Sequence, residues 1–211
     1  IRDDLVTGVQ TCALPICTAR NAAIVSELLS NEGWKARVAS MLPLDIAEEI
    51  PMDIFGLITG LPAETAYLPW DGPKVRLIEH QAHALGHGAL LIEERGVLVA
   101  GDMVSDILIP LLNLKTADPI EDYLTGLRLL ESVADSVDVF IPGHGSVGGA
   151  EQLRARIEQD RAYVQALRDG GVVDDPRIGP SATVGKDWAP GVHERQLQQL
   201  AQIREHDRTS R

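Results

Sequence analysis

Three segments of the chain each place a metal-competent side chain directly after an apolar stretch. They span residues 80–87, 97–102 and 139–145, and their central side chains are His83, Asp102 and His144. Strand ends flanked by glycine expose side chains at fixed positions on an α/β scaffold. Because imidazole and carboxylate are suitable ligands for zinc or a similar divalent metal, these residues predict a metal site between three loops.

The hydrophobic pattern around these segments predicts an α/β (α+β) fold, with strands and helices mixed along the chain. Strands are expected at Val75–Glu79, Gly88–Glu93, Val97–Ala100 and Val137–Ile141. The continuous apolar run of Val97–Ala100 is typical of a strand that is covered on both faces. Helices are expected over 18–32, from the Asp118 cap and Pro119 to Val133, over 150–169, and over His193–Glu205. Residues 172–191 are expected to be a loop.

The region between the first helix and residue 75 is rich in proline, and its pattern is weaker. Trp34–Ala39 and Ile54–Thr59 are expected as strands, and Leu44–Ile50 as a short helix. The remainder should be loop, since prolines interrupt both kinds of element.

Charge excludes one broad class of partner. The chain has 211 residues, with 19 basic and 31 acidic side chains and a net charge of -12. Such a balance disfavours a phosphate-neutralising surface, so we expect a small-molecule substrate and no nucleic acid.

No apolar run approaches the roughly 20 residues of a membrane span, so no membrane partner is expected. The two cysteines, Cys12 and Cys17, are too few for a disulfide framework, and a cytoplasmic location is expected. The oligomeric state is left open.

Residues 6–16 read Val-Thr-Gly-Val-Gln-Thr-Cys-Ala-Leu-Pro-Ile, which resembles the in-frame translation of a sequencing adapter. This similarity predicts that residues 1–16 are an artefact of a metagenomic assembly. They are therefore left out of the fold prediction, and the genuine domain is expected over 17–211.

From Val75 to Leu167 the sequence resembles the second half of the metallo-β-lactamase superfamily, in its glyoxalase-like branch. The matching motifs are His83 followed by Gly86-His87, then Gly101-Asp102, then Pro-Gly-His-Gly at 142–145. Ala82 stands where a glycine often precedes the first histidine. The resemblance implies an incomplete four-layer αβ/βα sandwich over 75–168, followed by a helical extension over 172–211.

By this resemblance, His83 would bind the first of two zinc ions and His144 the second. Asp102 would bridge both ions and act as the catalytic carboxylate. His87, Gly101, Gly143 and Gly145 would surround or support these ligands, and His80 would lie outside the site. The intact parent would hydrolyse an ester, thioester or similar small substrate through a metal-bound hydroxide.

The family's leading motif, His-x-His-x-Asp-His, does not occur, because no histidine precedes His80. That motif supplies ligands to both metals, so this chain is expected to be a truncated, inactive fragment of a hydrolase. Three other interpretations stay open at this point. They are a non-catalytic binding or regulatory module with the same fold, an unrelated mononuclear site, and a structural protein with coincidental motifs.

Overall fold

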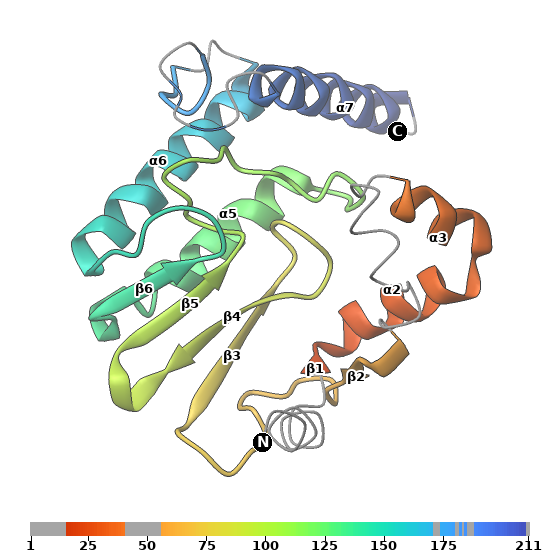
Figure 1. Cartoon of the computed structure of the whole chain (residues 1–211). Coiled ribbons are helices and arrows are strands. Elements are labelled where there is room, and N and C mark those ends of the chain that lie inside the picture. The colour runs from red at the N-terminus through yellow and green to blue at the C-terminus, as the bar shows by residue number, and fades with distance from the viewer. Residues whose placement is uncertain are drawn as a thin grey trace. The chain divides into compact units, whose positions relative to one another are not determined.

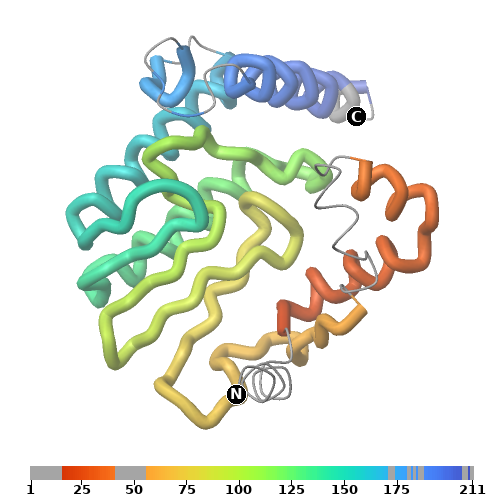
Figure 2. Tube along the Cα trace, in the orientation of Figure 1, coloured from red at the N-terminus to blue at the C-terminus, as the bar shows by residue number. Residues whose placement is uncertain are grey.

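The computed structural model describes residues 16–40, 56–170, 174–179, 182, 184 and 188–209, without the side chains of 206–208. The chain divides into two compact units, Ile1–Thr65 and Ala66–Arg211. Figure 1 labels the α-helices and strands, and Figure 2 follows the chain through all of the elements. They are β1 (Ile16–Cys17), α2 (Ala19–Ser30), α3 (Glu32–Ala39), β2 (Thr59–Gly60), β3 (Val75–His80), β4 (His87–Ile92), η2 (Glu93–Arg95), β5 (Val97–Gly101), α5 (Pro119–Glu131), η3 (Ala134–Ser136), β6 (Val139–Pro142), α6 (Ala150–Asp169) and α7 (Ala189–Thr209).

The first unit contains the helix predicted over 18–32, which the structure confirms as α2. Thr18 caps this helix, because its hydroxyl accepts a hydrogen bond from the Asn21 N–H at 3.2 Å. The short strands β1 and β2 pair in parallel, with Ile16 opposite Thr59. The adapter-like residues 6–15 and the helix predicted at Leu44–Ile50 lie outside the described residues.

The strand predicted at Trp34–Ala39 is wrong, because this segment belongs to the helix α3. Asn31 closes α2 and also opens α3, since its side chain accepts the Trp34 N–H at 2.9 Å. An asparagine that caps a second helix stabilises its first turn, although apolar and charged residues alternate in the segment that follows. The strand predicted at Ile54–Thr59 is described only from residue 56, and there Thr59–Gly60 alone is strand.

The second unit is built on a four-stranded sheet in the order β3-β4-β5-β6. The first two pairings are antiparallel. Strand β5 pairs in parallel with β6, and the connection between these two strands contains helix α5. All four strands lie where the sequence predicts them, and each end is within two residues of its predicted position. The prediction for α5 is also confirmed, since the Asp118 carboxylate caps it by accepting the Glu121 N–H at 3.0 Å.

Helices α5 and α6 lie on one face of this sheet (Figure 1). The side chains that point from the strands toward them are buried and form the core with apolar residues of both helices. On the strands, this buried set consists of Ile78, Ala89, Leu91, Leu98, Ala100 and Phe140. Because alternate residues of a strand point to opposite faces, their sequence neighbours must occupy the other face.

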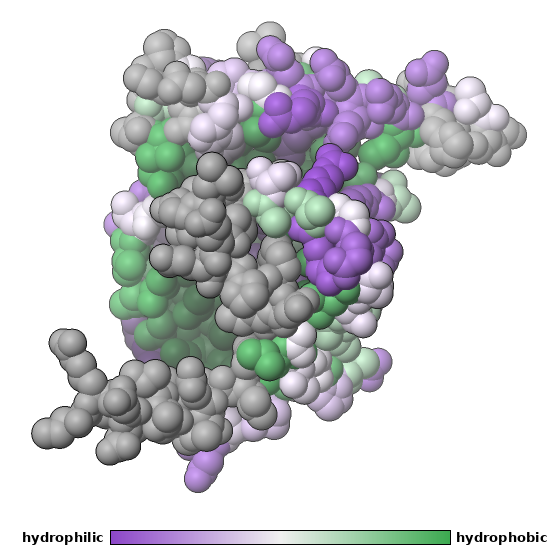
Figure 3. Space-filling model, turned by 45° about the vertical axis from the view of Figure 1, so that its right-hand side comes forward, coloured by the Kyte–Doolittle hydropathy of each residue, from purple (hydrophilic) through white to green (hydrophobic). Residues whose placement is uncertain are grey.

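The second face of the sheet is also aliphatic, and we call it the aliphatic face. Its cross-strand register forms two rows, Val75-Ile92-Val97-Val139 and Leu77-Leu90-Val99-Ile141. Val75 is buried, five of the others are half-buried, and Val139 and Ile141 are each 38% exposed. The prediction that Val97–Ala100 is covered on both faces therefore holds fully only for the helix side. Figure 3 shows hydrophobic residues gathered on one side of the molecule.

Short segments of the chain pair with both outer strands of the sheet. Tyr67 forms a bridge with Arg76 of β3, and Gly148 forms a bridge with Phe140 of β6. The second bridge has two backbone hydrogen bonds, of 2.8 and 3.1 Å.

The last helix, α7, begins at Ala189, four residues before its predicted start at His193. Its Gln196 is 3% exposed and joins the helix to the segment after β5. The Gln196 side chain accepts the Leu112 N–H at 2.8 Å and donates to the Pro110 carbonyl at 3.0 Å. Within the described part of the chain, no helix combines the length and apolar character needed to cross a membrane.

Candidate functional site

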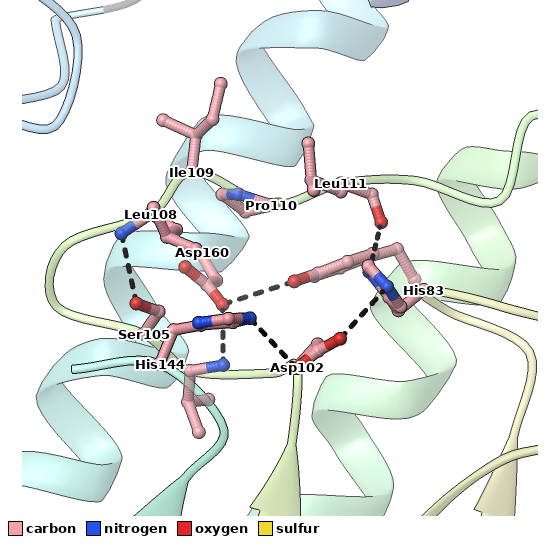
Figure 4. Close-up of a pocket in the computed structure, with 11 residues that line it drawn as sticks. His83, Asp102, Ser105, Leu108, Ile109, Pro110, Leu111, His144 and Asp160 are labelled. Carbon is pink, nitrogen blue, oxygen red and sulfur yellow. Dashed lines mark hydrogen bonds and ion pairs between the residues drawn. The ribbon is translucent and has the colours of Figure 1, made fainter. Parts of the chain in front are cut away.

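The structure brings His83, Asp102 and His144 together at one end of the sheet (Figure 4). His83 lies in the loop after β3, Asp102 directly follows β5, and His144 is the second residue after β6. Nε2 of His83 lies 3.3 Å from Oδ2 of Asp102, and Nε2 of His144 lies 3.5 Å from Oδ1. Each oxygen of one carboxylate therefore faces a different imidazole.

The ring of His83 is oriented by a backbone carbonyl. Its Nδ1 lies 3.2 Å from the carbonyl oxygen of Leu111, which can only accept a hydrogen bond. A neutral ring that donates from Nδ1 presents a lone pair at Nε2, and this lone pair faces the negative Asp102 carboxylate. Such an arrangement is suited to a metal ion between the two groups.

His87 supports the Asp102 backbone through a hydrogen bond. Its Nε2 accepts the Asp102 N–H at 3.1 Å, and its Nδ1 lies 3.3 Å from Nε2 of His80. Burial lowers the pKa of His80 to about 3 and that of His87 to about 4, with further lowering by neighbouring imidazoles. Both rings are therefore neutral at pH 7. This geometry places His87 between His80 and the Asp102 backbone.

His80 was expected outside the site, and the structure places it directly behind His87. It is only 5% exposed, and its Nδ1 lies 3.3 Å from the Ala82 backbone nitrogen. The sequence carried one signal for this position, because His80 stands at the end of one strand and His87 at the start of the next. An antiparallel hairpin makes such residues cross-strand partners, and His80 pairs with His87 in the register.

Two motif glycines permit close approaches inside the site. A Cβ on Gly101, whose φ is +60°, would lie 2.4 Å from Cε1 of His87. A Cβ on Gly143 would lie 2.5 Å from Oδ1 of Asp102. Any larger residue would displace the imidazole or the carboxylate, so these glycines are needed where the resemblance expects them.

A cavity of about 40 Å³ adjoins the three side chains (Figure 4). Most of its wall is apolar and comes from the segment after Asp102, namely Val104, Leu108, Ile109, Pro110 and Leu111. Tyr123 and Asp160 also line it, and the Tyr123 hydroxyl donates to Asp160 Oδ2 at 3.4 Å. Burial raises the pKa of Asp160 to about 6, against the opposing charge of Arg177. Sequence reasoning missed Asp160, because it lies inside a charged helical pattern with no motif around it.

The donors present do not form a complete metal centre. Within 16–40, 56–170 and the described residues beyond, no group of three or more His, Cys, Asp or Glu side chains is arranged to hold an ion. Two imidazoles and a carboxylate are of the right chemical type for zinc. However, His83 and His144 lie on opposite oxygens of Asp102, so the described residues do not close a coordination shell.

Comparison with solved structures identifies the fold. No protein-family model matches the sequence, and the search of curated proteins gives no match. Among solved structures, 51 chains match. A metallo-beta-lactamase family protein from Thermus thermophilus is 23% identical, with a TM-score of 0.56, over 92% of this chain and 67% of the other.

A beta-lactamase domain protein from Burkholderia ambifaria is similar over 74% of this chain and 47% of its own length, with 20% identity and a TM-score of 0.50. Identities this low establish the fold alone. The expected α/β architecture, with one sheet and its covering helices, is confirmed. The chain therefore shares its fold with these two proteins, and it spans only part of the length of their structures.

Proposed function

We propose that the chain is part of a metal-dependent hydrolase in which His83, Asp102 and His144 supply some of the ligands of a two-metal zinc centre. One observation carries the proposal, which is that the two oxygens of Asp102 face two different imidazole Nε2 atoms. Two histidines that lie on opposite oxygens of one carboxylate would suit a pair of metal ions that share this carboxylate.

The contact between His83 and the Leu111 carbonyl supports the same proposal. Histidines that bind metals usually donate their other ring N–H to a carbonyl or carboxylate, which fixes the ring and its tautomer. His83 has this contact at 3.2 Å and turns its second nitrogen toward Asp102. The side chain of His83 is 22% exposed and that of His144 is 53% exposed, so both remain accessible from solvent.

The remaining ligands would come from the His-x-His-x-Asp-His motif of a longer parent protein. The aliphatic face is consistent with this proposal, because a two-sheet sandwich buries both faces of each sheet. In the parent we propose an ester or thioester as substrate, with zinc as the metal. A small molecule fits a net charge of -12 better than a polynucleotide does. We also propose that the protein acts in the cytoplasm.

For the chain as given we propose weak metal binding and no useful hydrolysis, because the donors do not close a shell. The test is calorimetric titration of the chain with zinc, combined with a thioester turnover assay. We expect weak binding that Asp102→Asn reduces at least tenfold, and turnover no faster than that of free zinc. The matched control is Asp135→Asn, a carboxylate with 95% side-chain exposure that lies outside the site.

Two results would contradict the proposal. Zinc binding that survives Asp102→Asn unchanged would place the metal elsewhere. Tight stoichiometric binding with turnover would instead favour a self-sufficient mononuclear site. A second candidate, a non-catalytic binding module with this fold, is favoured by the absence of a three-donor group among the described residues. It predicts no zinc binding at any tested concentration.

A further inference from the structure

Helix α6 directs two charged side chains, one turn apart, toward the loops of the site. Arg156 is 8% exposed and Asp160 is 1% exposed, although both belong to a helix whose other charged residues are mostly on the surface. Residues four apart lie on the same face of a helix, so the two side chains act on neighbouring parts of the structure. A buried charge is costly unless it is paired, which makes their partners informative.

Asp160 holds the segment that follows Asp102. Its Oδ2 accepts the Val104 N–H at 3.2 Å, and Val104 has a φ of +53°. This left-handed conformation is unfavourable for a β-branched residue, so surrounding contacts must maintain it. The Asp160 carboxylate therefore fixes a strained backbone position two residues after Asp102.

Arg177 extends this support from the other side. Its Nη1 donates to Asp160 Oδ1 at 2.6 Å and to the carbonyls of Ser105 and Leu108 at 2.9 and 3.1 Å. Asp175 completes the pairing by accepting from Arg177 Nη2 at 2.7 Å. The guanidinium is 3% exposed, and it joins α6 to the backbone of residues 105–108.

Arg156 connects the His144 loop to the same segment. Its Nη1 donates to the Ser146 carbonyl at 2.8 Å, and its Nη2 lies 3.2 Å from Asp106 Oδ2. Asp106 in turn accepts the Ser146 N–H at 2.9 Å. Gly145, with a φ of +104°, makes room for this carboxylate, since a Cβ there would lie 2.0 Å from Asp106 Oδ1. The contact gives a structural reason for the last glycine of the motif.

We propose that Asp160 and Arg156 are positioning residues that set Asp102 between His83 and His144. Asp160 fixes the segment after Asp102, and Arg156 fixes the distance between that segment and the His144 loop. Calling this cluster the active site rests on the proposed function, whereas the positioning itself concerns the metal-free protein. The proposed function and the positioning role can therefore be disproved separately.

The test uses metal-free, ¹⁵N-labelled protein and records the imidazole nitrogen signals of His83 and His144, assigned with His→Gln variants. We expect Arg156→Gln to move the His144 signals by more than a line width. Arg156→Lys should restore at least half of that displacement, since a lysine keeps the charge opposite Asp106. Asp160→Asn should move the signals of both histidines, because Asp102 contacts both rings.

The matched control is Arg154→Gln, on the same helix as Arg156. It removes an exposed ion pair with Asp135 and should leave the signals of both rings unchanged. A folded Arg156→Gln protein with unmoved His144 signals would overturn the proposal, as would an equal displacement in the Arg154→Gln control. If Asp160→Asn fails to fold, the two Arg156 variants decide the question. Loss of stability alone does not shift native-state ring signals, so a purely structural role is distinguishable.

Discussion

The two faces of the four-stranded sheet carry similar residues but differ in their surroundings. On the face toward α5 and α6, strand side chains such as Leu91 and Leu98 are 2% exposed or less. On the aliphatic face, Leu90 and Val99 are only half-buried, and Ile141 is 38% exposed. Composition therefore predicts two buried faces, while the described structure fully buries one. The comparison shows that apolar periodicity records what a strand is suited to contact, and that the contact itself depends on the neighbouring elements.

The largest effect should come from a matched leucine pair on β4. Leu91→Ala removes a side chain that is 2% exposed and packed in the core, so it should lower the free energy of unfolding by about 2–5 kcal/mol. Leu90→Ala, on the half-buried aliphatic face, should lower it by about 1 kcal/mol, because less area returns to water. Urea unfolding measures both. Equal losses would mean that the aliphatic face is buried as deeply as the helix side.

A pH titration of stability sharpens the comparison, because His80 lies on the buried face. Its pKa falls from 6.5 to about 3 on folding, so the unfolded chain binds a proton more readily than the folded one. The stability from neutral His80 is fully present above pH 6.5 and is lost as the pH falls from there toward 3. The slope should reach about 1.4 kcal/mol per pH unit for this group.

Chemical unfolding at pH values from 7.5 to about 4 provides the measurement. His80→Gln should flatten the acid side of the curve, and part of the slope should remain because the pKa of His87 is also lowered, to about 4. Leu91→Ala should lower the whole curve and leave its slope unchanged. A slope that is identical with and without His80 would show that this ring is protonated without cost in the fold.

The smallest effect on stability is expected at the exposed end of the aliphatic face. Ile141→Thr should change the free energy of unfolding by no more than about 1 kcal/mol, because the side chain is already 38% exposed. The same change should reduce the fluorescence of a bound apolar dye, since it interrupts a row of aliphatic side chains. An unchanged signal would indicate that this row is not accessible to the dye.

The elements of the second unit could be predicted from sequence because local signals and tertiary contacts agree there. Asp118 and Pro119 begin α5, and Gly170 ends α6 in a left-handed conformation. At Trp34–Ala39 the sequence pattern pointed to a strand, but the segment is a helix whose first turn is capped by the Asn31 side chain. A short apolar run alone does not distinguish these two outcomes.

The three central site residues could be predicted because each follows a strand within a recognisable motif. Their supports could not be predicted in the same way. Asp160 and Arg177 are far apart in sequence from Asp102, and a charged residue in an amphipathic helix is usually solvated. Only the fold reveals that Arg177, in a segment expected to be plain loop, is 3% exposed and paired with two carboxylates.

The bridges at Tyr67 and Gly148 have a consequence for how copies of this chain would associate. An unpaired outer strand is a template for adding strands from other molecules, which leads to fibrous aggregates. Here the chain occupies part of the outer side of both β3 and β6 with its own backbone, and β6 is short and ends at Pro142. Self-association by strand addition is thereby disfavoured. At high protein concentration, copies of the chain should instead associate through their aliphatic faces, giving contacts that a mild detergent would disperse.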